Sequence, residues 1–290
     1  MNEKDWLMLK IIAEEKNITK AANRLFIAQP SMTYRLQQLE KEFATKIVSR
    51  NSTGVTLTPE GEYLLAYAQK MLLEFRAAKE KIQNMSGKVQ GTLRLGSSAI
   101  FAYYELPRLL KTFLEMYPLV DISLKTGLSQ KINRLLQTEE ISIAIVRGDF
   151  AWDTEKYLIR EEPICLVSPS PLTLEDLPKK PQITYGTDSA LKKMIEEWWR
   201  QIFSVPPLIN MEVDSMDTCR QMVLNGLGWA VFPEIGLPKQ DDLFVQHLFW
   251  KDGTPLKRRT WLLYHADSLE LSAVQAFIEY IKTTFATDEI

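Results

Sequence analysis

One segment decides how the first part of the chain folds: Thr19-Lys-Ala-Ala-Asn-Arg-Leu-Phe-Ile-Ala-Gln-Pro-Ser-Met-Thr-Tyr-Arg-Leu-Gln-Gln-Leu-Glu40. Its apolar residues fall into two helical groups, and Pro30 between them cannot lie inside one continuous helix. The small residues Ala21 and Ala22 let the two helices approach each other closely at a steep angle. The segment therefore predicts a helix-turn-helix.

The flanking residues predict where these helices begin and end. A first helix ends near Lys16-Asn17, and Thr19 is expected to cap the second helix. Phe26-Ile27-Ala28 is expected to form the turn and its apolar plug. The third helix begins at Gln29-Pro30, because proline is tolerated in a first turn. Its predicted buried residues are Met32, Leu36, Leu39 and Phe43.

The opposite face of the third helix carries hydroxyls, amides and one guanidinium rather than the Glu/Lys mixture of a solvated helix. Such groups pair with base edges and phosphates in a major groove, Arg with guanine and Gln with adenine. Arg35 is accordingly predicted to read a base, and a merely polar surface helix is the alternative. The predicted DNA-binding residues of the helix-turn-helix are Thr19, Gln29, Pro30, Ser31, Thr33, Tyr34, Arg35 and Gln38.

A short hairpin is predicted after the third helix. Ile47-Val48 and Val55–Leu57 have the apolar pattern of two strands around a polar turn. A two-stranded wing beside a recognition helix lies on the phosphate backbone. Arg50, Ser52 and Thr53 are therefore predicted to bind DNA.

A long helix is predicted to follow the wing. Thr58-Pro59 supplies a capping hydroxyl and a first-turn proline, and the helix runs to about Gly87. Apolar residues recur at positions 64, 67, 68, 71, 75, 78, 82 and 85, close to the spacing of a coiled-coil seam. This pattern favours a dimerisation helix, and packing against its own domain is the alternative.

Composition and charge place the chain among globular proteins of at least two domains. Its 290 residues are 46% apolar and 25% charged, and no run approaches the roughly 18 apolar residues of a membrane span. Residues 1–90 hold 14 Lys and Arg against 10 Asp and Glu, whereas the other 200 hold 21 against 27. This asymmetry favours a basic DNA-binding part on a neutral-to-acidic body.

The first residues and the cysteines predict where the protein resides. The N-terminus is acidic and lacks the apolar stretch of a secretory signal. Cys165 and Cys219 are isolated and are expected to be small buried hydrophobes. We therefore expect a cytoplasmic protein with reduced thiols and no membrane partner.

From Gly91 onward, predicted strands alternate with predicted helices, the pattern of an α/β fold with parallel sheets. The predicted fold is α/β with a winged helix-turn-helix at the N-terminus. The predicted divisions are a DNA-binding domain at 1–58, a linker and dimerisation helix at 59–88, and an effector-binding domain at 89–290. The last has subdomain I at 89–162 and 266–290 and subdomain II at 163–265, with a cleft between them.

Several pieces of sequence, in this order and spacing, resemble the LysR-type transcriptional regulators. They are Ile18–Ala22, Leu25, Gln29–Ser31, Leu39-Glu40, Arg50 and Leu57–Gly61. Two positions depart from the family: Ala28 stands where a capping Ser is usual, and Tyr34 stands where Arg is common. The missing cap is expected to cost about 1 kcal/mol of helix stability.

The resemblance implies partners and a ligand site. Family members bind double-stranded DNA as homodimers or homotetramers, with RNA polymerase as a further candidate partner. Their C-terminal half is similar to periplasmic binding proteins, and here Gly127–Ser129, Val213–Ser215 and Gly226–Pro233 match it. The resemblance implies a small, anionic effector between the subdomains and neither a metal nor another cofactor.

Strand ends supply the predicted effector-binding residues. In open α/β sheets a ligand lies beyond the carboxyl ends of the strands, where helix N-termini and backbone N–H groups hold an anion. The predicted set is Ser97, Ser98, Ser129, Arg147, Tyr185 and Phe232. Alternatives are that Ser129 only caps its helix and that Arg147 only forms an ion pair. Trp198, Trp199 and Trp229 are expected in the core.

Three other functions are alternatives to a regulator. An enzyme is disfavoured, because the chain has two histidines and lacks a P-loop, a GxGxxG turn, a GxSxG elbow and paired His metal ligands. A solute-binding protein conflicts with the helix-turn-helix. A DNA-binding protein with a purely structural body would differ from a regulator in showing no response to metabolites.

Overall fold

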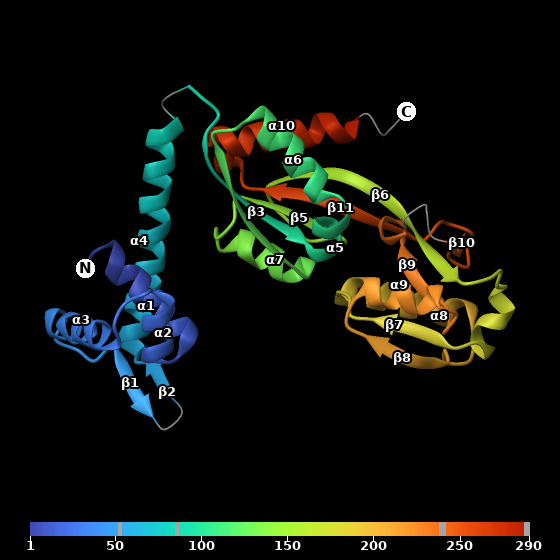
Figure 1. Cartoon of the computed structure of the whole chain (residues 1–290), viewed down its shortest axis with the longest axis horizontal. Coiled ribbons are helices and arrows are strands. Elements are labelled where there is room, and N and C mark those ends of the chain that lie inside the picture. The colour runs from blue at the N-terminus through green and yellow to red at the C-terminus, as the bar shows by residue number, and fades with distance from the viewer. Residues whose placement is uncertain (52–53, 85–86, 238–241, 287–290) are drawn as a thin grey trace. The chain divides into compact units, whose positions relative to one another are not determined.

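The computed structural model describes residues 1–51, 54–84, 87–237 and 242–286 (Figure 1). The chain divides into two compact units, Met1–Met85 and Ser86–Ile290. Within the described residues, no helix combines the length and apolar character needed to cross a bilayer.

The first unit contains the predicted helix-turn-helix. Its elements are α1 (Glu3–Glu15), α2 (Ile18–Arg24), α3 (Gln29–Glu42), the hairpin β1 (Val48–Asn51) and β2 (Gly54–Leu57), and α4 (Pro59–Asn84). The cap of α2 differs from the prediction: Asn17 Oδ1 accepts a hydrogen bond of 3.0 Å from the Lys20 amide. Thr19 lies one residue inside the helix and is exposed, so it cannot cap.

The core of this unit confirms most of the predicted buried face of α3. Met32, Leu36 and Leu39 are buried together with Ala21 and Ala22 of α2. Two predictions are wrong. Phe43 is 41% exposed, because α3 ends at Glu42 and Phe43 is its C-cap. Phe26 is 96% exposed, so the turn contains no plug made by this ring.

Helix α4 packs partly on its own unit. Thr58 caps it as predicted, since its Oγ1 accepts a 3.0 Å hydrogen bond from the Gly61 amide. Leu64 and Ala68 are buried in the core beside α1, and the Trp6 and Phe75 rings meet edge to face at 6.4 Å. The alternative of packing within the domain is therefore correct for this part. Farther along, Ile82 remains 68% exposed.

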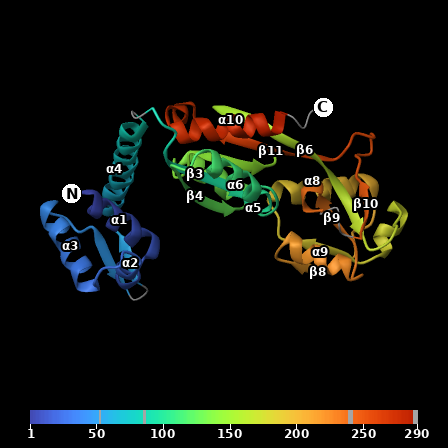
Figure 2. The same ribbon diagram turned by 45° about the horizontal axis from the view of Figure 1, so that its top comes forward.

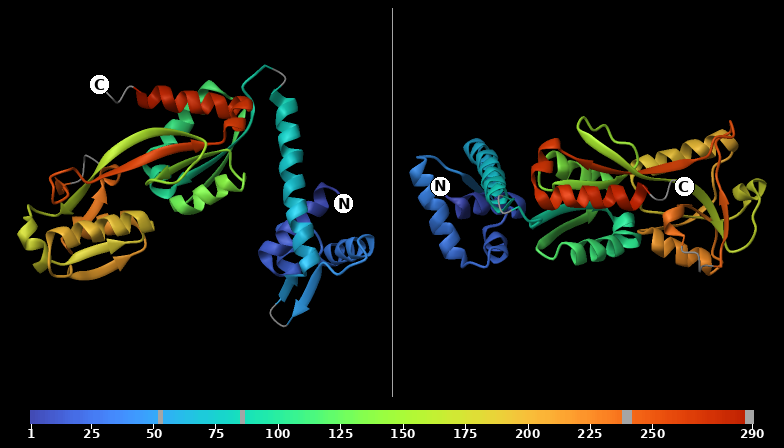
Figure 3. Two further views of the ribbon diagram at one scale, coloured as in Figure 1. Left: turned by 180° about the vertical axis from the view of Figure 1, so that it is seen from behind. Right: turned by 90° about the horizontal axis from the view of Figure 1, so that it is seen from above.

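The second unit contains two lobes that share long strands (Figures 1 and 3). In the first lobe β3 (Gly91–Ser98) pairs in parallel with β4 (Val120–Gly127) and β5 (Ile143–Arg147). Beyond β5, β11 (Lys257–Tyr264) runs antiparallel and pairs in turn with β6 (Glu155–Ser168). The expectation of parallel strands is therefore confirmed for β3, β4 and β5, and the sheet is mixed because the return strands β6 and β11 join it antiparallel.

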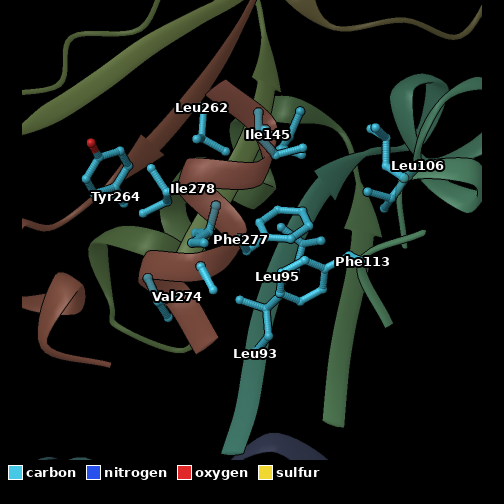
Figure 4. Packing of buried hydrophobic residues seen from close by; sticks show 14 of the residues in the cluster. Leu93, Leu95, Leu106, Phe113, Ile145, Leu262, Tyr264, Val274, Phe277 and Ile278 are labelled. Atoms are coloured by element: carbon cyan, nitrogen blue, oxygen red, sulfur yellow. The ribbon is translucent and has the colours of Figure 1, made fainter. Parts of the chain in front are cut away.

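Helices cover both faces of the first lobe. They are α5 (Ala99–Tyr104), α6 (Leu106–Met116) and α10 (Ser272–Ala286) on one face and α7 (Ser129–Gln137) on the other. Helix α7 is labelled in Figure 1, and the helices of the other face are labelled in Figure 2. Figure 4 shows Phe113 of α6 against Phe277 of α10, edge to face with ring centroids 5.0 Å apart. Ile145 faces this cluster, whereas Ala144 and Val146 face α7.

The second lobe has its own core. Its elements are β7 (Gln182–Tyr185), α8 (Ser189–Ile202), β8 (Ile209–Val213), α9 (Met216–Leu224), β9 (Ala230–Pro233) and β10 (Phe244–His247). Strands β9 and β10 pair with the far half of β6. Trp198, Trp199 and Trp229 are buried here as predicted. Both cysteines are also buried, and burial raises the pKa of each thiol to about 12.

Candidate functional site

The exposed face of α3 carries most of the side chains that were predicted to contact DNA. Gln29, Pro30, Ser31 and Tyr34 are exposed, and Thr33 and Gln38 are partly exposed. Gln29 Nε2 donates to Thr33 Oγ1 at 2.8 Å. The helix begins at Ala28 without a side-chain cap, as the sequence predicts, so its first amides remain available to an anion.

Arg35 does not belong to this free surface. Its Nε and Nη2 donate to the two carboxylate oxygens of Asp5, each at 2.6 Å. Asp5 is 2% exposed and lies in α1. Burial alone raises the pKa of Asp5, but the hydrogen bonds from Arg35 and the Asn2 amide outweigh it, so the pKa lies below its ordinary value. The pair joins α1 to α3, so the guanidinium is held within the protein, and its predicted role in reading a base stays a prediction.

Glu40 is a positioning residue that the sequence analysis missed. Its carboxylate accepts hydrogen bonds from Lys46 Nζ at 2.8 Å and from the Ile47 amide at 3.1 Å. Burial raises the pKa of Glu40, but these donors outweigh it and lower the pKa. Glu40 therefore fixes the end of α3 to the start of the wing. The side chain of Arg50 and the whole of Ser52 and Thr53 lie outside the described residues.

In the second unit, the strand ends meet as predicted. Ser98 is paired with Gly127, and Ser97 with Ile145, so β3 ends beside β4 and β5. The Arg147 amide donates to Ser129 Oγ at 3.0 Å. Ser129 therefore joins α7 to β5 and does not cap its helix, whose N-cap residue is Leu128 and which has no side-chain cap. The capping alternative is wrong.

Arg147 lies at the centre of this arrangement. It is 1% exposed, and its Nη2 forms an ion pair with Glu162 of β6, itself 1% exposed. The other Glu162 oxygen accepts from the Ile235 amide at 2.7 Å. Burial, together with the neighbouring Arg258 guanidinium, lowers the pKa of Arg147. The predicted ion pair is present, but it uses only one of the three guanidinium nitrogens.

Arg258 and Asp188 complete the cluster, and sequence analysis missed both. Arg258 of β11 donates to the Arg147 carbonyl at 3.2 Å and forms an ion pair with Asp188. Asp188 also caps α8, accepting from the Leu191 amide at 3.1 Å. The sequence signal was weak, because the apolar run begins only at Trp261, whereas β11 begins at Lys257 and places Arg258 at an inward position. A charged residue at such a position is rarely fully buried unless it is paired, as Arg258 is with Asp188.

The buried cluster leaves several donors without an acceptor. Among the described residues, no hydrogen-bond partner is found for Arg147 Nε and Nη1, Arg258 Nε, Ser98 Oγ or Tyr185 Oη. Nitrogens of guanidinium groups only donate, and hydroxyls can donate. The group that satisfies these atoms must therefore present acceptors. An oxyanion such as a carboxylate or a phosphate fits this set of donors.

The remaining predicted residues have different positions. Tyr185 is 9% exposed, and its ring lies 5.5 Å from that of Phe232. Phe232 is fully buried behind it and belongs to the core of the second lobe. Ser97 Oγ donates to the Ser98 carbonyl at 3.2 Å. Tyr185 is thus the aromatic residue whose polar atom belongs to the cluster.

A pocket of about 540 Å³ lies elsewhere in the second lobe, between α8 and the β7–β8 pair. Its walls include Ile183, Trp199 and Phe203, and of the predicted set only Tyr185 lines it. Size favours this pocket as a ligand site, whereas unpaired buried donors favour the Arg147 cluster. The unpaired donors are the stronger indication of a ligand site. Burying a polar group without a partner costs free energy, and the type of donor specifies the chemistry of the ligand.

Two family models match the chain. The helix-turn-helix of the lysR family of bacterial regulatory proteins matches residues 4–62, and the LysR substrate binding domain matches residues 86–286. YraN, an uncharacterized HTH-type transcriptional regulator of Bacillus subtilis (strain 168), is 44% identical over 282 residues, covering 97% of this chain and 98% of that protein. YkuM of the same organism is 38% identical over 277 residues, covering 95% and 94%.

Solved structures share the fold over nearly the whole chain. Full-length CbnR in complex with its target DNA has a TM-score of 0.66 at 20% identity, covering 98% of this chain and 100% of CbnR. Full-length OxyR from Pseudomonas aeruginosa has a TM-score of 0.64 at 21% identity, covering 97% and 95%. At this level of identity the likeness concerns the arrangement of elements, not the residues of the sites.

Proposed function

Because the chain belongs to the LysR family of helix-turn-helix transcriptional regulators, a non-enzymatic family, we propose that it reads one operator through α3 and the wing and is switched by an oxyanion. The proposed DNA-binding residues are the exposed ones of α3, with Arg50, Ser52 and Thr53 of the wing on phosphates. Arg35 and Glu40 position these elements.

The proposed effector is a small anionic metabolite bound between the lobes. The observation that carries this proposal is the set of buried donors without acceptors around Arg147 and Arg258. The N-terminus of α7, which has no side-chain cap, adds backbone amides near Ser129. Because Arg147 lies in the first lobe and Tyr185 in the second, an anion that engages both favours one relative position of the lobes.

The proposed assembly is a dimer formed through α4, or a tetramer of such dimers. Exposed apolar side chains on this helix include Tyr67, at 46%, and Ile82, at 68%. A two-fold dimer would recognise half-sites about one helical turn of DNA apart, or a multiple of that spacing. As a DNA-bound regulator the protein would act in the cytoplasm, where RNA polymerase is a further expected partner.

A ligand panel tests the effector proposal. The full chain is unfolded thermally in the presence of mono- and dicarboxylates, phosphates and sulfonates at constant ionic strength. A specific ligand at 100 times its Kd adds about 2.7 kcal/mol to the free energy of unfolding. The variant Arg147→Met with Glu162→Met is the matched control, because it removes the guanidinium and its counterion together. Equal stabilisation of wild type and control by every ligand would contradict the proposal.

A further inference from the structure

Phe26 has an unusual environment for a large apolar side chain. It lies in the turn between α2 and α3 and is 96% exposed, although sequence analysis predicts it to plug the turn. Its amide donates to the Asn23 carbonyl at 3.1 Å, and the Ile27 amide donates to the Ala22 carbonyl at 3.1 Å. The backbone of the turn is therefore held by hydrogen bonds, while the ring gains nothing from burial.

The backbone at Phe26 is also in a conformation that such a residue disfavours. Its φ is +55°, in the left-handed region, where Gly and Asn are at ease and bulky side chains are strained. Lys16, Ala44 and Glu139 also have positive φ within the described residues, and Phe26 is the aromatic member of that group. The strained backbone costs stability and the exposed ring regains none of it by burial, which points to a partner that contacts the ring.

We propose that Phe26 contacts the C5 methyl group of a thymine in the operator and so determines sequence preference at that base pair. An apolar side chain against this methyl is one of the direct contacts available in the major groove. Duplex DNA is the partner that the position favours, because Phe26 lies three residues before Gln29, at the uncapped start of the helix proposed to enter the groove. The inference rests on that proposed function.

The test uses the full chain and a duplex that the wild-type protein selects from a random library. Each thymine is replaced in turn by uracil, which removes only the C5 methyl. Three proteins are compared: wild type, Phe26→Asn, and Phe43→Asn as a matched control. The Phe43→Asn substitution makes the same chemical change at the other end of α3, where Phe43 is 41% exposed.

We expect uracil at one position of each half-site to weaken wild-type binding about fourfold, the value of one buried methyl group. Phe26→Asn should bind the thymine duplex more weakly by a similar factor and be indifferent to that uracil, whereas Phe43→Asn should respond as wild type does. The midpoint temperature of the first unit should rise by about 4 °C in Phe26→Asn, since Asn tolerates the left-handed conformation. A merely structural role would not combine higher stability with weaker binding.

Other outcomes overturn the inference. Wild-type binding that no uracil weakens, or Phe26→Asn that keeps the wild-type sensitivity to uracil, excludes the methyl contact while leaving the proposed operator binding intact. Phe26→Asn that binds every duplex normally but fails to regulate transcription in vitro would assign Phe26 to a protein partner instead. A wild-type chain that selects no duplex would refute the proposed function itself.

Discussion

Arg35 and Arg147 both form ion pairs with buried carboxylates, but they differ in what remains free. Two nitrogens of Arg35 donate parallel hydrogen bonds to the Asp5 carboxylate, and the Arg35 side chain is 41% exposed. One nitrogen of Arg147 pairs with Glu162, and the other two nitrogens are unpaired. The Arg147 side chain is 2% exposed. Arg35 is thus occupied within the protein, whereas the two unpaired nitrogens of Arg147 are the observation that supports the proposed anion site.

The largest expected effect follows from removing the Arg147 guanidinium. A second variant separates the loss of the ion pair from the loss of anion binding. Arg147→Met leaves Glu162 buried without its counterion and should lower the free energy of unfolding of the second unit by about 3–5 kcal/mol. The double variant with Glu162→Met should recover most of this loss while remaining unresponsive to anions. Urea unfolding followed by tryptophan fluorescence measures both. If the double variant were as unstable as the single one, the ion pair would not explain the loss.

Arg35→Ala should act on the stability of the first unit rather than on sequence preference. Asp5 would be left buried without its partner, at a cost of about 2 kcal/mol, less than for Arg147 because Arg35 is partly exposed. Binding to the selected duplex and to a random duplex should weaken in proportion. Unchanged stability with a loss confined to the selected duplex would return Arg35 to base reading.

Acid should destabilise the first unit through two of its carboxylates. Hydrogen bonds lower the pKa of Asp5 and Glu40, so the folded form binds their protons less readily than the unfolded chain does. Their stabilisation is complete above the ordinary pKa values of 3.8 and 4.5 and is lost as the pH falls through the lower folded values. Urea midpoints measured from about pH 3 to pH 6 should show this loss of stability. The loss should be smaller in the double variant Asp5→Asn with Arg35→Gln. An equal loss in that variant would exclude Asp5 as its source.

The smallest expected effects concern two helices that begin without a side-chain cap. Ala28→Ser should stabilise α3, and Leu128→Ser should stabilise α7, each by about 0.5–1 kcal/mol, because a hydroxyl can accept from a first-turn amide. The same hydroxyls would occupy amides that in α3 are available to an anion and that in α7 we assign to the effector. Calorimetry with duplex and anion titrations should therefore show slightly weaker binding. Tighter binding in either variant would remove these amides from the site.

The local sequence pattern predicted most helices and strands. It failed for side chains whose role depends on a partner that is distant in the sequence. The helix-turn-helix follows from Pro30 and from apolar spacing, and both are local. The role of Arg35 depends on Asp5, thirty residues away, and helical spacing within α3 contains no information about α1. Arg258 was missed for a related reason: β11 begins at Lys257, whereas the apolar run predicted a strand only from Trp261. Its partner Asp188 belongs to the other lobe.

The shared strand β6 has a mechanical consequence. Its near half pairs with β11 in one lobe and its far half pairs with β9 and β10 in the other, without a break in the backbone. The pairing of β6 with β11 is irregular at Thr260/Trp261, two residues from Arg258. The two lobes are thus joined by paired strands, so a rotation of one lobe against the other would have to twist a hydrogen-bonded ribbon.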